Sequence, residues 1–316
     1  MNKIKNLNPS HFIGEGALII MTIIWGGTFV IVKESLNDIS PIFFVALRFG
    51  IAGAIIALIM FFKKRRIKKK DIMAGLFLGV FLFLGFVLQT IGLKHTSATK
   101  SGFLTGSLVV MVPFLQMIIE KKLPSRGALV GTVFVFIGIL FLSSGDSSIT
   151  TFLGNLGASF NLGDGLTLAC AFFFAFQVVY LDIFSKKYDF WILFVTQLLS
   201  VSILAFIAAG LFHFTSMEVI YINYSNNLII GFLYTILLAT CLNFGLQTKF
   251  QKRVSPTKAG IIYSFEPIFA ALFAFFLLSE KISNFGLVGC ILIFSGLIIS
   301  EIFDTLLPDG KRVSKS

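Results

Sequence analysis

Long apolar runs alternate with short polar segments along almost the whole of this 316-residue chain. A helix needs about 20 apolar residues to cross the ~30 Å hydrocarbon core of a bilayer, and ten runs reach or approach that length. Because a helix satisfies its backbone hydrogen bonds within one segment, the pattern predicts an all-α integral membrane protein. The predicted spans are 17–35, 40–62, 71–93, 99–119, 126–143, 164–184, 190–212, 227–248, 257–278 and 284–303.

The composition agrees with this pattern. The chain is 56% hydrophobic and 13% charged, and it has a mean hydropathy of +0.93. A soluble domain cannot bury so much apolar surface, so lipid must cover part of it. The three cysteines, Cys170, Cys241 and Cys290, lie far apart inside apolar runs without the spacing of metal ligands. We interpret them as small core residues and predict neither a metal site nor a cofactor.

The basic residues predict the orientation. With the N-terminus on the cytoplasmic side, 21 of the 26 Lys and Arg residues fall in cytoplasmic segments and four in outer segments, and Arg48 lies inside a helix. This asymmetry predicts two cytoplasmic termini and a multi-pass protein of the cell membrane. Because the net charge of +11 follows the topology, it does not indicate a nucleic-acid partner. The basic run 63–70 is interpreted as a topology anchor, with contact to anionic lipid as the alternative.

The chain is built twice from one plan. Ser97-Ala-Thr-Lys-Ser-Gly102 returns as Ser255-Pro-Thr-Lys-Ala-Gly260, and Gly14-Glu-Gly16 returns 149 positions later as Gly163-Asp-Gly165. Each half has five predicted helices, so the second half enters the membrane inverted, as in many secondary transporters. The predicted domains are a first five-helix repeat (14–143), an extracytoplasmic linker (144–163), a second five-helix repeat (164–303) and a cytoplasmic tail (304–316).

Two charged residues are predicted inside the membrane, where charges are costly and usually functional. Arg48 lies ~10 Å from the outer end of its helix, and Glu266 lies ~14 Å from the inner end of another, at the helical rise of ~1.5 Å per residue. One interpretation makes Arg48 the anchor of a substrate carboxylate and Glu266 its counter-charge or a proton-coupled group. The alternative is a permanent Arg48–Glu266 pair, or separate pairs of the two residues with backbone carbonyls, that orients two helices.

Other polar and kink-forming residues also fall within the predicted spans. The remaining candidates for substrate binding are Trp25, Thr28, Gln89, Gln177, Tyr180, Gln197, Asn243 and Tyr263, with interhelical hydrogen bonding as the alternative role. Gly26, Gly27, Pro113 and Pro267 are candidates for gating, with close helix packing or a static bend as the alternative.

These motifs and their order resemble the EamA-type ten-helix permeases of the drug/metabolite transporter superfamily. The resemblance rests on Trp25-Gly-Gly-Thr-Phe29, Ala46-Leu-Arg-Phe49, Ser97–Thr105 with Val112-Pro113, Ser255–Gly260, Glu266-Pro267 and Ser279-Glu-Lys281. It covers roughly residues 14–303. The family's usual Gly-Glu-Arg is Ser279-Glu280-Lys281 here, and the first half has Ile119-Glu-Lys121. The resemblance implies export or exchange of small metabolites, commonly amino acids or related compounds, without ATP.

Motifs of enzymes do not change this interpretation. The chain has no Gly-x-x-x-x-Gly-Lys-Ser/Thr phosphate loop, no His-Glu-x-x-His and no Gly-x-Ser-x-Gly, so we predict no enzymatic activity. We predict a secondary transporter that works by alternating access, with a small-molecule substrate, the bilayer and a coupled proton as partners. Its oligomeric state is predicted as monomer or homodimer. Export of amino acids is the first expectation, efflux of lipophilic cations or metabolite uptake the second, and a non-transporting membrane partner protein the third.

Overall fold

The computed structural model describes residues 9–63, 65, 67–143, 151, 160–278 and 284–306. The described residues are almost entirely helical. The helices are α1 (Pro9–Ser35), α2 (Pro41–Phe62), α3 (Lys69–His95), α4 (Ala98–Gly106), α5 (Leu108–Glu120), α6 (Arg126–Ser143), α8 (Leu162–Ser185), α9 (Phe190–Phe214), α10 (Asn226–Leu233), the π-helix η1 (Tyr234–Leu242), α11 (Asn243–Phe250), the 3₁₀-helix η2 (Gln251–Arg253), α12 (Pro256–Tyr263), α13 (Glu266–Leu278) and α14 (Asn284–Leu306).

The helices coincide with the ten predicted apolar runs. Within the described residues, eight spans are long and apolar enough to cross a membrane, three of them made of consecutive shorter helices. Two shorter apolar helices, α6 and α14, account for the other two runs. Ser279-Glu-Lys281 and most of the predicted linker 144–163 and tail 304–316 lie outside the described residues.

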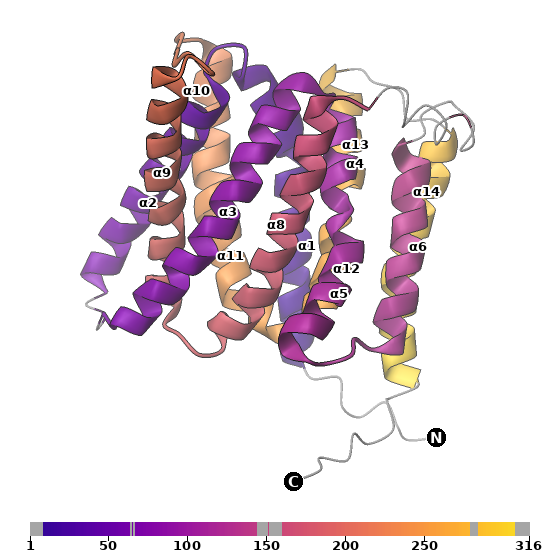
Figure 1. The fold of residues 1–316 in the computed structure, drawn as a ribbon. Coiled ribbons are helices and arrows are strands. Elements are labelled where there is room, and N and C mark those ends of the chain that lie inside the picture. The colour runs from indigo at the N-terminus through magenta and orange to yellow at the C-terminus, as the bar shows by residue number, and fades with distance from the viewer. Residues whose placement is uncertain are drawn as a thin grey trace.

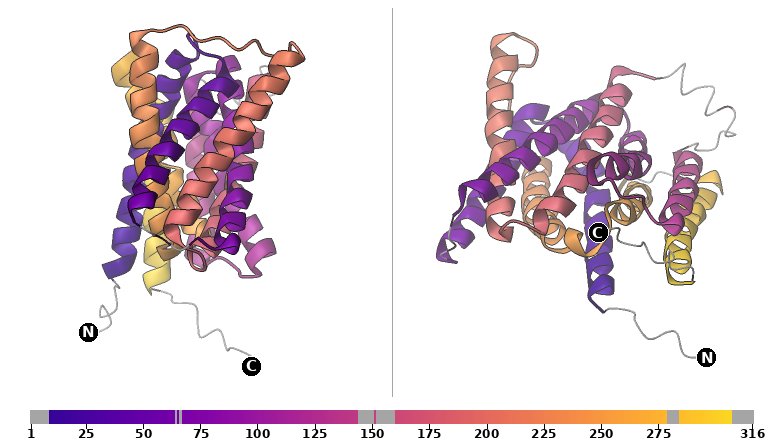
Figure 2. Two further views of the ribbon diagram at one scale, coloured as in Figure 1. Left: turned by 90° about the vertical axis from the view of Figure 1, so that its left-hand side faces the viewer. Right: turned by 60° about the horizontal axis from the view of Figure 1, so that its bottom comes forward.

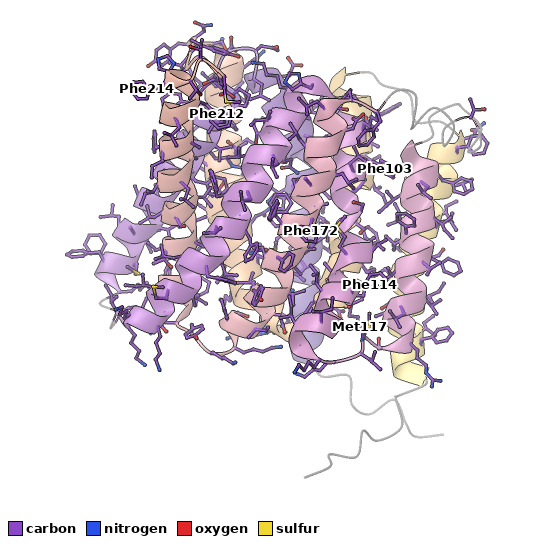
Figure 3. All side chains as sticks on the ribbon, viewed as in Figure 1. Phe103, Phe114, Met117, Phe172, Phe212 and Phe214 are labelled. Atoms are coloured by element: carbon purple, nitrogen blue, oxygen red, sulfur yellow. The ribbon has the colours of Figure 1, made fainter. Side chains whose placement is uncertain are left out.

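Large apolar side chains project from the outside of the bundle (Figure 3). Phe114 is 58% exposed, Phe172 is 45% exposed and Phe214 is 86% exposed. Exposed apolar surface on this scale is unfavourable in water but matches hydrocarbon. The protein is therefore a multi-pass membrane protein.

The helices form one bundle with two distinct edges (Figures 1 and 2). At one edge α6 packs along α14, and at the other α2 packs along α9. Between them, α1 packs against α13, and α3 crosses α8 and α9. A methyl group added at Gly131 would lie 2.6 Å from the carbonyl oxygen of Gly296, so the α6–α14 contact requires glycine there.

The two ends of the bundle are named from the chain. Helix α1 begins and helix α14 ends at the same end of the bundle, which we call the terminal end (Figure 1). The opposite end is called the distal end. The connection from α3 to α4 and the start of α8 lie at the distal end. The start of α12 lies at the terminal end.

Two predicted helices are interrupted in the middle of the bundle. The run 99–119 breaks at Ser107, whose hydroxyl donates to the carbonyl of Leu104 at 2.6 Å, and Pro113 lies farther along, inside α5. The run 257–278 breaks at Ser264–Phe265, and Pro267 is the second residue of the helix that follows. Pro267 has no backbone N–H to donate to the carbonyl of Tyr263, and its ring clashes with that carbonyl, so a continuous helix is not possible there. The π-helix η1 within the run 227–248 was not predicted, because π-hydrogen bonding leaves no simple sequence pattern.

Candidate functional site

A cavity lies at the centre of the bundle, between the broken helices and α1, α2, α3, α8 and α11. Its volume is about 50 Å³, which holds only a few water molecules. Side chains from both halves of the sequence line it, and most of them are apolar or aromatic. Such a site could accept a small organic solute only after neighbouring helices move apart.

Arg48 supplies the positive charge of the cavity. Its side chain is almost fully buried, and Nε donates to Thr240 Oγ1 at 2.8 Å. The guanidinium carbon lies 5.1 Å from the ring centre of Phe49 and 5.0 Å from that of Phe86, which are favourable cation–π distances. Nη2 is buried without a hydrogen-bonding partner. A buried donor without a partner is costly, so Arg48 is suited to receive an acceptor from a ligand.

Glu266 supplies the acidic group of the cavity. It is the first residue of α13, directly after the helix break, and its side chain lines the same cavity. Among the described residues, no ion pair joins Glu266 to Arg48. The permanent Arg48–Glu266 pair that was one of the sequence-based alternatives is therefore not formed in this structure.

Aromatic rings make up much of the cavity wall. The ring centre of Trp25 lies 5.6 Å from that of Phe244 and 5.7 Å from that of Tyr263. Phe86 lies 5.0 Å from Phe174, again between ring centres. The Trp25 indole N–H donates to the carbonyl of Ala239 at 3.1 Å, which fixes the ring. The cavity therefore has rigid flat faces around its basic and acidic groups.

Neutral polar groups close the cavity on the side of the terminal end. Gln177 and Gln247 exchange amide hydrogen bonds of 3.3–3.4 Å, and Gln247 Nε2 also donates to the Tyr263 hydroxyl at 3.4 Å. The Tyr263 hydroxyl in turn donates to Gln251 Oε1 at 2.6 Å. On the other side, Gln89 Nε2 donates to Thr105 Oγ1 at 3.1 Å. These groups could also hydrogen-bond a polar solute.

The structure brings together most of the residues selected from the sequence. Seven of the ten binding candidates line the cavity, namely Trp25, Thr28, Arg48, Gln89, Gln177, Tyr263 and Glu266. Three lie elsewhere. Tyr180 stacks on Phe81 and Phe176, Gln197 donates to Thr248 Oγ1 at 2.9 Å, and Asn243 donates to the carbonyl of Met21 at 3.0 Å.

The sequence interpretation missed Phe86, Phe174, Phe244 and Thr105, which also line the cavity. Phenylalanine accounts for 39 residues, so residue type alone could not single these out. The internal repeat carried a usable signal, because Phe174 lies 149 positions after Trp25, the same offset that relates Gly163 to Gly14. Within the described ranges, no group of three or more His, Cys, Asp or Glu residues could hold a metal ion.

Comparison with known families identifies this arrangement. The model of the EamA-like transporter family matches residues 12–144 and, a second time, residues 161–301. The chain belongs to the EamA-like transporter family. This confirms the resemblance drawn from the motifs, and the two matches coincide with the two halves of the internal repeat.

The sequence similarity to relatives covers nearly the full length of this EamA-like transporter. It is 31% identical over 287 residues to an uncharacterized transporter of Archaeoglobus fulgidus, covering 89% of this chain and 83% of that protein. It is 22% identical to the uncharacterized transporter YoaV of Bacillus subtilis, covering 90% and 94% of the two chains. A crystal structure of another protein shares the fold, with a TM-score of 0.69, 15% identity, and coverage of 94% and 99%. The protein is therefore a membrane transporter.

Gly26 and Gly27 form contacts between helices of this EamA-like transporter. A methyl group added at Gly26 would lie 2.5 Å from Phe269 Cβ and 2.9 Å from the backbone nitrogen of Ala270, both on α13. One added at Gly27 would lie 2.5 Å from the Tyr234 hydroxyl. That hydroxyl donates to the carbonyl of Ile24 at 2.7 Å. The two glycines thus let α1 approach α13 and η1 beside the cavity.

We expect Gly26→Ala to lower stability by about 1–3 kcal/mol, because the added methyl forces α13 away from α1. For a protein of this size the melting temperature should fall by several degrees. The measurement is thermal unfolding of the detergent-purified protein, followed by fluorescence. Gly210→Ala is the matched control, because a methyl group there meets no atom within 4 Å. Equal melting temperatures for the two variants would contradict the close approach.

Proposed function

We propose that this EamA-like transporter is a secondary transporter that moves small zwitterionic or anionic metabolites, amino acids above all, by alternating access. One observation carries the proposal. A buried cavity is lined by one basic residue, Arg48, and one acidic residue, Glu266, and the two form no ion pair in the described structure. A substrate with a carboxylate and an ammonium group would complement both residues. The proposed direction of transport is outward, and it rests on the family resemblance.

The proposed topology has ten crossings in two inverted five-helix repeats, residues 14–143 and 164–303. The terminal end faces the cytoplasm, because the segments there hold most of the basic residues. On this basis the transporter lies in the cell membrane with both termini inside.

The cavity itself supports the inverted repeat, because equivalent residues of the two halves line it. With the Ser97 motif aligned to the Ser255 motif, equivalent residues in the later part of each half lie 158 positions apart, against 149 in the earlier part. The equivalent pairs that line the cavity are Trp25 and Phe174, Thr28 and Gln177, Phe86 and Phe244, Gln89 and Gln247, and Thr105 and Tyr263. A substrate site on the axis that relates two inverted repeats is the arrangement expected of such transporters.

The helix breaks also support alternating access. Ser107, between α4 and α5, is equivalent to Phe265, between α12 and α13, at the same offset of 158. Each half therefore has one hinge at the depth of the cavity. Such a hinge lets the outer or inner part of a helix move while the rest stays packed.

One observation favours a second candidate, the efflux of lipophilic cations. The aromatic wall of Trp25, Phe86, Phe174 and Phe244 beside Glu266 could hold a cation through ring faces and one carboxylate. Arg48 opposes this candidate, because its buried charge would repel a cation.

Flux in proteoliposomes decides between these candidates. The panel holds labelled amino acids, their carboxamides and cationic dyes. The proposal predicts saturable flux of at least one amino acid, measured with the membrane potential held at zero. The carboxamide of that amino acid should move more slowly. Flux of cationic dyes alone would replace the first candidate with the second. A folded protein that moves none of the panel would contradict both.

A further inference from the structure

We infer that two ion pairs, one at each end of the bundle, are the latches that close the cavity to the two sides of the membrane. The distal ion pair joins Lys100 to Asp164, with Nζ 2.6 Å from Oδ2. The terminal ion pair joins Lys258 to Glu15, with Nζ 3.0 Å from Oε1. This inference rests on the proposed alternating access, and it names the groups that control it.

The two ion pairs occupy equivalent places in the internal repeat. Lys100 and Lys258 are the same position of the Ser97 and Ser255 motifs, and Glu15 and Asp164 are the middle residues of the two Gly-acid-Gly motifs. In each pair the lysine comes from one half and the acid from the other. Each pair therefore links the two halves, and the internal symmetry places the pairs at opposite ends of the bundle.

The surrounding contacts repeat as well. Ser97 and Ser255 cap their helices by accepting the backbone N–H of Lys100 at 3.1 Å and of Lys258 at 3.4 Å. A methyl group added at Gly163 would lie 2.8 Å from His95 Cβ. One added at Gly14, the equivalent glycine, would lie 3.0 Å from Arg253 Cβ, and Arg253 is equivalent to His95. The same close contact between the halves is thus made twice.

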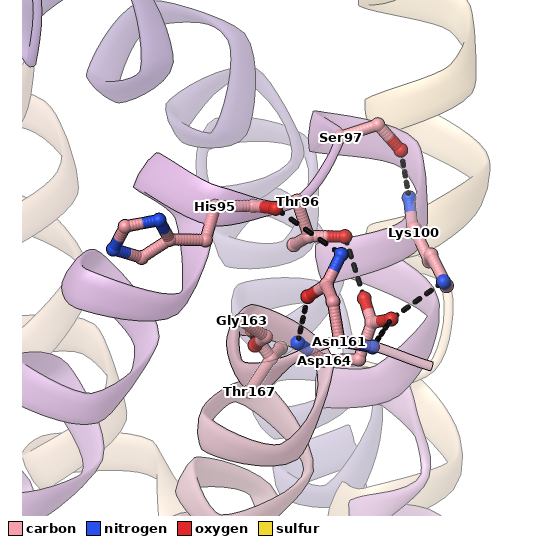
Figure 4. Close-up of polar contacts among 8 residues, drawn as sticks. All are labelled: His95, Thr96, Ser97, Lys100, Asn161, Gly163, Asp164 and Thr167. Atoms are coloured by element: carbon pink, nitrogen blue, oxygen red, sulfur yellow. Dashed lines mark hydrogen bonds and ion pairs between the residues drawn. The ribbon is translucent and has the colours of Figure 1, made fainter. Parts of the chain in front are cut away.

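The distal ion pair is the more strongly held of the two (Figure 4). Asp164 is fully buried, and besides Lys100 it accepts from Thr96 Oγ1 at 2.6 Å and from the backbone nitrogen of Asn161 at 3.0 Å. Lys100 keeps 23% of its side chain exposed, and Lys258 and Glu15 keep 15% and 14%, so the two pairs differ in the burial of the acid. Separating the fully enclosed carboxylate of Asp164 from its partners costs more than separating the partly hydrated carboxylate of Glu15. The protein therefore opens more readily at the terminal end.

Both pairs are formed here, and the cavity between them is only about 50 Å³. On this inference, the structure with both latches formed is closed at both ends. Opening toward one side separates the halves at that end and breaks the pair there, while the equivalent pair keeps the other end shut. No continuous pore forms as long as one of the two latches stays closed.

The test uses a single reporter thiol in the cavity. Thr28→Cys is placed in a background in which Cys170, Cys241 and Cys290 are alanine, because Thr28 lines the cavity. A membrane-impermeant thiol reagent is applied to right-side-out or inverted vesicles, and the labelling rate is measured from each side. The reporter alone should react faster from the side of the terminal end.

Removing each lysine should shift the rates in opposite directions. Lys100→Gln should raise labelling from the distal side about tenfold or more and lower it from the terminal side. Lys258→Gln should raise labelling from the terminal side, by a smaller factor of about three. The matched control is Lys252→Gln, because Lys252 is exposed and forms no ion pair among the described residues. This control should change neither rate.

Two further variants separate charge pairing from misfolding. Glu15→Lys combined with Lys258→Glu should restore the original rates, because it reverses the partly exposed pair without removing it. Asp164→Asn should change the labelling rates as Lys100→Gln does, because it removes the negative charge that pairs with Lys100. The asparagine keeps an oxygen that accepts from Thr96, so the local hydrogen bonding is preserved. Shifts in the same direction for both lysine variants, or unchanged rates with normal melting temperatures, would overturn the inference.

The outcome can be told apart from that of the proposed function, because labelling needs no substrate. Amino-acid flux with unchanged labelling rejects the latches and keeps the transporter proposal. Opposite labelling shifts without flux of any amino acid keep the latches and reject the proposed substrate class.

Discussion

Arg48→Gln lowers amino-acid transport about 30-fold or more while the protein stays folded. Losing one partner of a buried, hydrogen-bonded charge pair costs about 2 kcal/mol or more, which is roughly 30-fold in affinity. Arg48 has an Nη2 without a partner in the closed structure, so a substrate carboxylate is the acceptor that completes it. The effect should appear in the KM for flux and in the thermal stabilisation by added substrate.

Folding should not suffer in the same variant. A buried charge without a matching counter-charge contributes little net stability, and its neutral replacement is often neutral or stabilising. We therefore expect the melting temperature of Arg48→Gln without substrate to stay at the level of the parent protein. Arg48→Lys should retain partial transport, because it keeps the charge but loses the planar donor geometry.

The carboxamide of the transported amino acid tests the role of Arg48 directly. The parent protein should prefer the carboxylate over the carboxamide, and Arg48→Gln should lose that preference. Gln197→Ala is the matched control, because Gln197 is the repeat equivalent of Arg48 and lies outside the cavity. A variant that transports the carboxylate as well as the parent protein would contradict the anchoring role.

The sequence predicted which apolar runs are helical, because bilayer thickness and backbone hydrogen bonding leave few solutions for such runs. It did not predict the break at Ser107. There, six residues before Pro113, the residue that the sequence indicated as a kink, the hydroxyl of Ser107 donates to the carbonyl of Leu104. Local side-chain capping of this kind depends on rotamers and on neighbouring helices, which no periodic pattern records.

The charged residues of the cavity could be predicted because a charge inside a membrane helix is costly and rarely faces lipid. The neutral residues could not be assigned in the same way. Gln177 and Tyr180 lie less than one turn apart on α8, and one lines the cavity while the other stacks on Phe81 and Phe176. α8 is apolar on every face, so hydrophobic periodicity cannot distinguish their directions.

Glu266→Gln abolishes uphill transport while leaving exchange intact. Glutamine keeps the shape of the side chain and an oxygen that can accept a hydrogen bond from the substrate ammonium, so binding and exchange continue. It cannot bind or release a proton, so a transporter coupled through Glu266 becomes uncoupled. If one proton is exchanged per substrate, a gradient of one pH unit supports accumulation of up to about tenfold in the parent protein. In Glu266→Gln that accumulation should vanish, and counterflow of labelled against unlabelled amino acid should continue.

The two assays are run on the same proteoliposomes, with and without an imposed pH gradient. Glu218→Gln is the matched control, because Glu218 lies in the loop between α9 and α10, away from the cavity. Among the described hydrogen bonds, its carboxylate accepts only from the backbone nitrogen of Ile42, at 3.3 Å. Persistent accumulation in Glu266→Gln would show that another group carries the proton. Loss of counterflow as well would show that substrate binding itself needs the carboxylate of Glu266, because exchange requires binding but no net proton movement.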